Sequence, residues 1–171
     1  TDLYELTMCA SYFDNNRTEP ATFDLFIRNL PTERSYYVAA GLEQVLLYLK
    51  NVAFTPAQIE YLRKRGFKEK FLNYLKGFKF SGEVWAIPEG TLAFEEEPLI
   101  RVTAPIIEAQ LVESFLLNTV NLQTMIATKD TRVVHAAQSR SVVEFGLRLT
   151  QGADATIKAA RCSYIAGCSG T

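Results

Sequence analysis

The sequence is poor in the side chains from which structural metal sites and disulfide frameworks are built. It has three cysteines, Cys9, Cys162 and Cys168, and a single histidine, His135. The cysteines are odd in number and none lies in a CxxC pair, so that with one histidine they cannot supply the ligands of a Cys/His zinc site. We therefore expect reduced thiols and no metal site of this kind.

An excess of one charge and long hydrophobic runs are missing as well. The 18 basic and 19 acidic side chains leave a net charge of -1, which creates no field to attract nucleic acid or an anionic membrane. Polar residues interrupt every apolar stretch before it reaches the roughly 20 residues that cross a bilayer. The opening TDLYELTM carries acids where a secretory signal has basic residues. We expect a cytoplasmic protein without nucleic-acid or membrane partners.

The common short motifs of nucleotide and hydrolase sites are also absent. Neither GxGxxG nor a GxxxxGK motif followed by Ser or Thr occurs, and there is no GxSxG. These absences remove the usual dinucleotide, P-loop and serine-nucleophile signals. What is present is 48% hydrophobic and 22% charged residues, a composition typical of a globular protein with a buried core.

The first half of the chain predicts one strand among four helices. Apolar residues recur every three or four positions in the helical segments, and Asp2 and the Thr55, Pro56 pair are typical helix starts. Apolar and polar residues alternate in the strand. Helices are expected over residues 2–13, 39–50, from Pro56 to Gly66 and over 69–76, and the strand over residues 21–31.

The second half predicts a small sheet followed by a long helix. Residues 79–103 combine β-branched and aromatic residues with turn residues, which favours a small antiparallel sheet. From Pro105 to about Ala137 the polar face is small, which predicts one buried helix between two domains. His135, near its end, is expected to be a hydrogen-bonded structural residue and not a catalytic one. The acidic run 95–97 is expected to keep a loop solvated.

The last segment predicts the start of a βα repeat. Residues 141–146, with the sequence SVVEFG, are typical of a buried strand, and the small residues after them favour a helix packed closely on a sheet. A parallel sheet needs several such units. We therefore expect these 171 residues to be part of a longer protein.

Residues that could carry chemistry gather where this strand ends. Ligands of parallel sheets and barrels bind at the carboxyl ends of strands. Phe145 offers a flat π face, Gly146 lets a ligand approach the backbone, and Arg148 offers a fork that matches phosphate or carboxylate. A planar anionic substrate would use all three. On the pattern alone, a core phenylalanine and a surface arginine at a βα turn are the commoner arrangement.

Two residues of the first half are weaker candidates. Tyr4 lies one turn into the first helix, where a tyrosine is more often an interface or core residue than a ligand contact. Arg28 lies at the end of the predicted strand and could clamp a phosphate, although a solvated arginine is the commoner occurrence there. The pattern leaves both roles open.

Six segments, in matching order and spacing over nearly the whole chain, resemble the nicotinate phosphoribosyltransferase family. They are TDLYELTM, FDLFIRNLP, AAGLEQVLLYL, WAIPEGTLAFEEEPLIRV, IIEAQLVESFLLNTVNLQTMIATK and EFGLRLTQGADA. The resemblance implies a type II phosphoribosyltransferase with an α/β fold. Residues 1–125 would form an N-terminal α/β sandwich domain with a linking helix. Residues 126–171 would form the first, incomplete part of an irregular TIM-like barrel.

The resemblance also implies a shared active site in a homodimer or higher homo-oligomer. Phe145 and Tyr4 of the partner subunit would sandwich a pyridine ring. Arg148, after Gly146, would meet the phosphate of the mononucleotide or of phosphoribosyl pyrophosphate, and Arg28 of the partner subunit would reach the same polyanion.

The implied reaction forms nicotinate mononucleotide and pyrophosphate from nicotinate and phosphoribosyl pyrophosphate, in NAD biosynthesis, with Mg2+ and coupled hydrolysis of ATP. The histidine that becomes phosphorylated would lie beyond Thr171, and Thr171 would border the site. Leu149 and Ala153 stand where relatives often carry an arginine and a proline, which affects the details of phosphate binding. Nicotinamide or quinolinate specificity and a noncatalytic dimerisation fragment are the alternatives.

Overall fold

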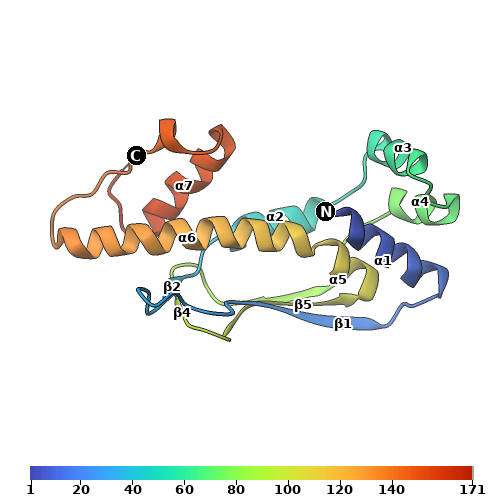
Figure 1. Cartoon of the computed structure of the whole chain (residues 1–171), viewed down its shortest axis with the longest axis horizontal. Coiled ribbons are helices and arrows are strands. Elements are labelled where there is room, and N and C mark those ends of the chain that lie inside the picture. Colours follow the sequence, from blue (N-terminus) through green and yellow to red (C-terminus); the bar gives the residue numbers. More distant parts are fainter. Residues whose placement is uncertain (171) are drawn as a thin grey trace. The chain divides into compact units, whose positions relative to one another are not determined.

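Seven α-helices and five short strands form a mixed α/β fold in the computed structural model, which describes residues 1–170 (Figure 1). In chain order they are α1 (Leu3–Asp14), β1 (Pro20–Phe26), β2 (Tyr37–Val38), α2 (Leu42–Asn51), α3 (Pro56–Lys64), α4 (Glu69–Lys76), β3 (Glu83–Ala86), β4 (Leu92–Ala93), β5 (Pro98–Pro105), α5 (Ile106–Leu111), α6 (Glu113–Ala137) and α7 (Ala153–Ile165). A short 3-10 helix, η1 (Leu147–Leu149), precedes α7. The α/β class expected from the sequence is confirmed.

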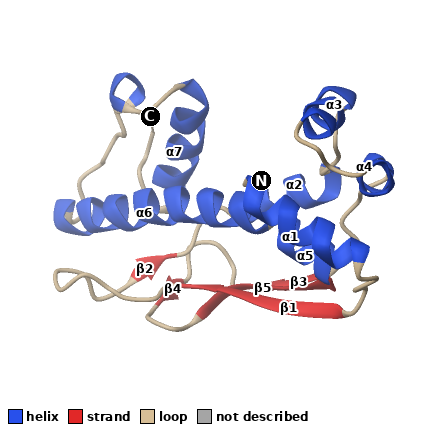
Figure 2. Cartoon of the chain, turned by 45° about the vertical axis from the view of Figure 1, so that its right-hand side comes forward, coloured by secondary structure: helices blue, strands red, loops and turns tan. Residues whose placement is uncertain are grey.

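The strands form two small sheets (Figure 2). In one, β5 lies between β1 and β3, and in the other β2 pairs antiparallel with β4, with Tyr37 opposite Ala93 and Val38 opposite Leu92. The sheet expected over residues 79–103 is therefore only partly right, because its three strands are divided between two sheets. β2 was not predicted, since two residues are too few to show an alternation.

The chain divides into two compact units, each built from three separate segments. The first unit comprises Thr1–Asp24, Glu43–Trp85 and Arg101–Leu116, and the second comprises Leu25–Leu42, Ala86–Ile100 and the residues from Leu117 onward. The segments of the two units alternate along the sequence. The single boundary after residue 125 that the family resemblance implies stays a prediction.

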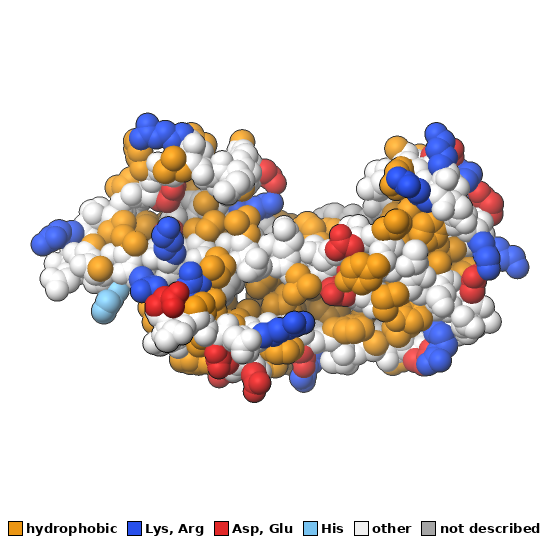
Figure 3. Space-filling view, in the orientation of Figure 1, with side chains coloured by type: hydrophobic (Ala, Val, Ile, Leu, Met, Phe, Trp, Pro, Cys, Tyr) orange, Lys and Arg blue, Asp and Glu red, His pale blue; other side chains and the backbone are white. Residues whose placement is uncertain are grey.

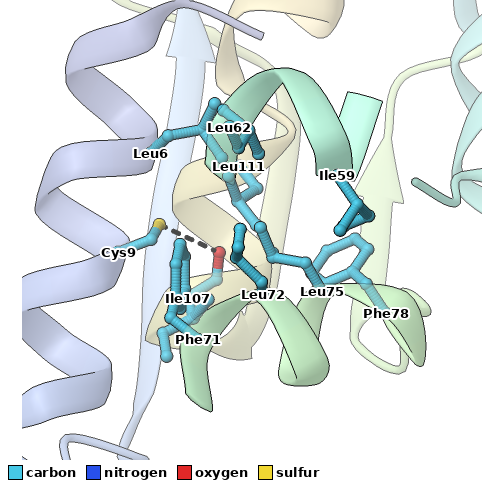
Figure 4. Packing of buried hydrophobic residues seen from close by; sticks show 10 residues of the cluster. All are labelled: Leu6, Cys9, Ile59, Leu62, Phe71, Leu72, Leu75, Phe78, Ile107 and Leu111. Carbon is cyan, nitrogen blue, oxygen red and sulfur yellow. Dashed lines mark hydrogen bonds between the residues drawn. The ribbon is translucent and has the colours of Figure 1, made fainter. Parts of the chain in front are cut away.

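The core of the first unit is formed by α1, α3, α4 and α5 (Figure 4). Its buried residues are Leu6, Cys9, Ile59, Leu62, Phe71, Leu72, Leu75, Phe78, Ile107 and Leu111. Phe13 extends the core, with its ring centroid 5.7 Å from that of Phe71 and 5.3 Å from that of Tyr74. The Cys9 thiol donates to the Ile107 carbonyl at 3.6 Å. Burial raises the pKa of this thiol to about 12, so it stays protonated.

The helices α3 and α4 begin and end close to where the sequence predicts. The Thr55 hydroxyl accepts the N–H of Gln58 at 3.3 Å, and the Gln58 side chain accepts the N–H of Thr55 at 2.8 Å, the reciprocal bonds of a capping box. Pro56 occupies the first turn of α3. Gly66, at φ +90°, follows its end in a conformation that glycine adopts readily.

The single helix expected from Pro105 to Ala137 is wrong, because the chain breaks at Val112 between α5 and α6. The fully buried carboxylate of Glu5 accepts the N–H of Ser114 at 3.1 Å and its hydroxyl at 3.0 Å. Glu5 also accepts the N–H of Asp2 at 3.1 Å. A side chain from α1 therefore caps the first turn of α6 and satisfies a donor that a new helix start leaves free.

In the second unit, the buried face of α6 is partly polar. The Thr128 hydroxyl accepts the N–H of Val38 at 2.9 Å, and the Thr124 hydroxyl both accepts the N–H of Ala40 and donates to its carbonyl at 3.2 Å. These hydroxyls provide the buried backbone groups beside β2 with the partners they need. Ala127 and Cys162 of α7 pack with Val38 and Ala40 as a small core.

The end of α6 is exposed, which corrects the expectation of a helix buried along its length. Val133 is 47% exposed and His135 is exposed in the last turn. The hydrogen-bonded structural role expected for His135 stays a prediction. No helix among the described residues is long and apolar enough to span a membrane.

The strand expected over residues 141–146 is also wrong. Within it, Val143 alone forms a β-bridge, parallel to Gly170. A single bridge does not extend into a strand unless neighbouring strands form hydrogen bonds with the remaining backbone N–H and C=O groups. The helix expected after it is confirmed as α7.

We expect Glu5→Ala to lower the free energy of unfolding by about 1–3 kcal/mol, because it removes the acceptor of the N–H and hydroxyl of Ser114 in a largely buried setting. Glu5→Gln keeps one acceptor oxygen and should lose less. Chemical denaturation followed by circular dichroism measures both. The exposed Glu60→Ala is the control, with a loss below about 0.5 kcal/mol. Equal stability of Glu5→Ala and wild type would contradict the cap.

Candidate functional site

The candidate site is built on a backbone turn that two extended segments hold in place. The N–H of Glu144 donates to the carbonyl of Gly170 at 2.9 Å, and the N–H of Ser169 donates to the carbonyl of Val142 at 2.8 Å. The helix α7 connects these two segments. The chain then passes from Glu144 into η1 and α7, so the turn starts from a fixed point.

Phe145 and Arg148 lie together at this turn. The guanidinium carbon of Arg148 is 5.7 Å from the ring centroid of Phe145, within the range of a cation–π contact. Phe145 is 76% exposed, so within this chain it is not part of the hydrophobic core. In the space-filling view, hydrophobic and basic side chains lie together over η1 and α7, at the upper left (Figure 3). Both side chains line a cavity of about 480 Å3, whose other lining residues are Glu144, Leu147, Thr156 and Ala160.

Gly146 was expected to let a ligand approach the backbone, but its surroundings differ from this expectation. Its backbone lies at φ -97° and ψ 6°, which any residue can adopt. A side chain at this position would instead collide with the carboxylate of Glu144, which accepts the N–H of Gly146. The carbonyl of Gly146 accepts the N–H of Leu149 and the hydroxyl of Thr150, both at 2.8 Å. The group that approaches this backbone closely is therefore a carboxylate of the same chain.

Tyr4 belongs to the first compact unit and is half exposed on α1. Its hydroxyl donates to Glu113 at 3.3 Å, and Gln110 donates to the other oxygen of Glu113 at 2.7 Å. Partial burial and the charges of Glu113 and Glu5 raise the pKa of the Tyr4 phenol. The Tyr4 side chain is thus neutral at physiological pH and about half exposed.

Arg28 lies just after β1 and lines a second cavity, of about 540 Å3. The polar residues around it in this cavity are Asn29, Tyr37, Asn118, Asn121 and Thr124. Of the five predicted site residues, the structure brings Phe145, Gly146 and Arg148 together. Arg28 lies at another cavity, and Tyr4 lies in the other unit. The prediction for Thr171 falls outside the described residues.

Two residues that sequence patterns did not single out hold α7 in place. Arg161 donates to both oxygens of Glu89, at 2.9 and 2.6 Å. Glu89 also accepts the N–H groups of Gly41 and Leu42, at 2.7 and 3.1 Å. Burial opposes ionisation of Glu89, but the hydrogen bonds and charge of Arg161 and the two N–H groups outweigh it and lower the pKa of the carboxyl. The sequence marks Glu89 only as part of a turn.

No group of three or more His, Cys, Asp or Glu side chains within residues 1–170 is arranged to hold a metal ion. The candidate site of the second unit instead offers the aromatic face of Phe145 and the guanidinium of Arg148. This set suits a planar ligand with an anionic substituent.

Comparison with known proteins gives the family to which these features correspond. Residues 1–121 match the model of the nicotinate phosphoribosyltransferase (NAPRTase) N-terminal domain. The chain is 49% identical over 172 residues to a nicotinate phosphoribosyltransferase of Mycobacterium tuberculosis, covering all of this chain and 37% of that protein. It is 43% identical over 173 residues to the nicotinate phosphoribosyltransferase of Bacillus subtilis, covering 35% of it. The chain therefore spans little more than a third of these relatives.

Solved structures show the same relationship. The crystal structure of human nicotinic acid phosphoribosyltransferase superposes with a TM-score of 0.91 at 32% identity, over 99% of this chain and 35% of that one. The nicotinate-nucleotide pyrophosphorylase from Pyrococcus furiosus superposes with a TM-score of 0.77 at 24% identity, over 99% of this chain and 36% of that one. The second likeness shows the fold alone.

Glu89→Gln should destabilise the protein in a pH-dependent way. Because the pKa of Glu89 is lowered in the folded state, the ionised pair stabilises the fold above the ordinary pKa range of Glu, and this contribution is lost as the pH falls through the folded-state pKa. At pH 7 we expect a loss of about 1–3 kcal/mol, which shrinks below about pH 4. Denaturation curves between pH 3 and 7 measure it.

The matched control is Asp154→Asn, which breaks an exposed pair with Lys158 and should cost less than about 0.5 kcal/mol. A stability difference between wild type and Glu89→Gln that stays constant over this pH range would rule out the ionised pair as its source.

Proposed function

The chain belongs to the nicotinate phosphoribosyltransferase family, and we propose that the protein containing it forms nicotinate mononucleotide and pyrophosphate from nicotinate and phosphoribosyl pyrophosphate. The observation that carries this proposal is the contact between Phe145 and Arg148 at a common cavity. An aromatic face and a fixed cation, side by side, match a flat pyridine and a phosphate-bearing sugar.

In the proposed reaction the pyridine nitrogen attacks C1 of the ribose. The N–C1 bond forms as the bond from C1 to the pyrophosphate oxygen breaks, and pyrophosphate leaves with the electron pair. No protein nucleophile is needed. The protein contributes by holding the two substrates in line and by stabilising negative charge on the leaving group. Phe145 would stack on the ring and Arg148 would bind phosphate.

We also propose that residues 126–171 begin an irregular TIM-like barrel. Val143 and Gly170 pair in parallel, and the helix α7 lies between them in sequence. This is the connection of a βαβ unit. On α7, Ile157 and Tyr164 are 72% and 77% exposed, as expected for a face that further barrel units cover.

A second copy of the protein is part of the proposal. Leu3, Tyr4 and Met8 on α1 are exposed hydrophobic residues, and we propose that this face meets another subunit. Tyr4 of the partner subunit would then complete the stack on the pyridine ring, and Arg28 of the partner subunit would reach the phosphates. This arrangement would give both residues, neither of which lines the Phe145 cavity, a role in the same site.

Mg2+ and ATP are proposed as cofactors on the basis of the family. Mg2+ in phosphate chemistry is commonly held by one or two carboxylates together with substrate phosphates and water, so it would enter with phosphoribosyl pyrophosphate. Arg148 would share the charge of these phosphates. The histidine phosphorylated by ATP is expected beyond Thr171, and His135, exposed at the end of α6, is not proposed for this role.

Turnover of three pyridines tests the proposed function. The enzyme that contains this chain is incubated with phosphoribosyl pyrophosphate, Mg2+ and nicotinate, nicotinamide or quinolinate, with and without ATP. Formation of nicotinate mononucleotide in preference to the other two products, faster with ATP, is expected. Preferential use of nicotinamide or quinolinate would replace the proposed substrate. A stable dimer that binds ligand but turns over none of the three would point to a noncatalytic fragment.

Substitutions at the site should separate the two substrates. Phe145→Ala is expected to weaken nicotinate binding by about 1–3 kcal/mol, by analogy with bases stacked on aromatics. Arg148→Ala should chiefly weaken binding of phosphoribosyl pyrophosphate. Isothermal titration with each substrate measures both effects.

Phe94→Ala and Arg132→Ala, at exposed positions that do not line this cavity, are the matched controls and should bind both substrates normally. Unchanged affinities in both Phe145→Ala and Arg148→Ala would remove this cavity from the active site.

A further inference from the structure

Glu144 is the residue beside the candidate site whose role the proposed reaction leaves open. Its side chain turns along its own backbone and accepts the N–H of Gly146. It also lines the same cavity as Phe145 and Arg148. The carboxylate is thus placed within a turn of three residues and does not face away into solvent.

The N–H of Gly146 depends on this carboxylate. The backbone bonds of the turn use the carbonyl of Gly146, which accepts from Leu149, and the N–H of Glu144, which donates to Gly170. The N–H of Gly146 is part-buried and has Glu144 as its acceptor. This bond restrains the turn, because breaking it would leave a part-buried N–H without its acceptor.

The glycine at position 146 is explained by the same contact. Its φ and ψ are ordinary, so backbone conformation does not require glycine. The one group close to where a Cβ would stand is the Glu144 carboxylate. An alanine here would therefore push the carboxylate aside and break its bond to the N–H, while the backbone itself could stay in place.

We propose that Glu144 is a positioning residue, which clamps the N–H of Gly146 and thereby sets the turn that presents Phe145 and Arg148 to their ligands. The proposal rests on the proposed function of the cavity. The two presented side chains flank the clamped N–H in sequence, and their contact at 5.7 Å requires a defined turn between them. Glu144 acts as a hydrogen-bond acceptor here, and neither its charge nor a proton transfer is used.

A double-mutant cycle tests this role in the enzyme that contains the chain. The variants are Glu144→Ala, Gly146→Ala, the double variant and Glu144→Gln. Isothermal titration gives the dissociation constants of nicotinate and phosphoribosyl pyrophosphate, steady-state kinetics gives kcat and KM, and the thermal midpoint checks folding. Glu144→Ala and Gly146→Ala should each weaken binding of both ligands about tenfold, as expected for loss of one hydrogen bond.

Two results separate positioning from a general loss of structure. The double variant should bind no more weakly than Glu144→Ala, because both single changes break the same bond. Glu144→Gln should stay within about threefold of wild type, because its amide oxygen still accepts the N–H. Should Glu144→Ala fail to fold, Gly146→Ala carries the test, because it keeps the carboxylate and an allowed backbone.

Several outcomes would overturn the proposal. Normal ligand affinity in Glu144→Ala would show that the clamp does not position the turn. Fully additive losses in the double variant would show that Gly146 serves the ligand directly. A loss in Glu144→Gln as large as in Glu144→Ala would indicate a role for charge or proton transfer. If Phe145→Ala and Arg148→Ala bind normally, the proposed function fails; if they bind weakly and Glu144→Ala does not, only the positioning role fails.

Discussion

The carboxylate of Glu89 is the constraint on which the second unit of the chain depends. It joins the guanidinium of Arg161 on α7 to the N–H groups of Gly41 and Leu42. Burying a carboxylate costs free energy unless hydrogen bonds compensate it, and here four donors do so. Gly41 adopts φ +107°, a conformation that glycine takes readily, and a Cβ at this position would lie only 3.1 Å from the carbonyl oxygen of Thr119. The candidate site immediately precedes the helix that this pair anchors.

Local signals were sufficient for part of the fold. The bounds of α3 and α4 follow from Thr55, Pro56 and the glycines after each helix, because caps and backbone conformation act within a few residues. The break at Val112 could not be predicted in this way. It depends on Glu5, more than one hundred residues away in sequence, which caps the new helix start. The short strand β2 likewise forms by pairing with β4. Its two residues are too few to show the apolar–polar alternation of a strand.

The candidate site shows the same division between local and distant information. Phe145 and Arg148 are three residues apart, so the sequence alone suggested that they lie close together, and the structure places them at one cavity. Sequence patterns pointed to Gly146 as a point of ligand approach and missed the carboxylate of Glu144 that occupies this space. The joint roles of Tyr4 and Arg28 came from the family resemblance. Both side chains would act in the active site of a second subunit. The sequence of one chain does not show how two subunits are arranged.

The threonine hydroxyls on α6 have a consequence for how specifically this helix is seated. Thr124 and Thr128 are one helical turn apart, and each serves a different backbone segment, at Ala40 and Val38. If α6 slid along its axis by one turn, one of these buried amides would face Val120 or Arg132, which offer no neutral hydroxyl acceptor. A purely apolar face would tolerate such a shift at little cost. The hydroxyls therefore select a single axial position for α6, in addition to the energy of its hydrophobic packing.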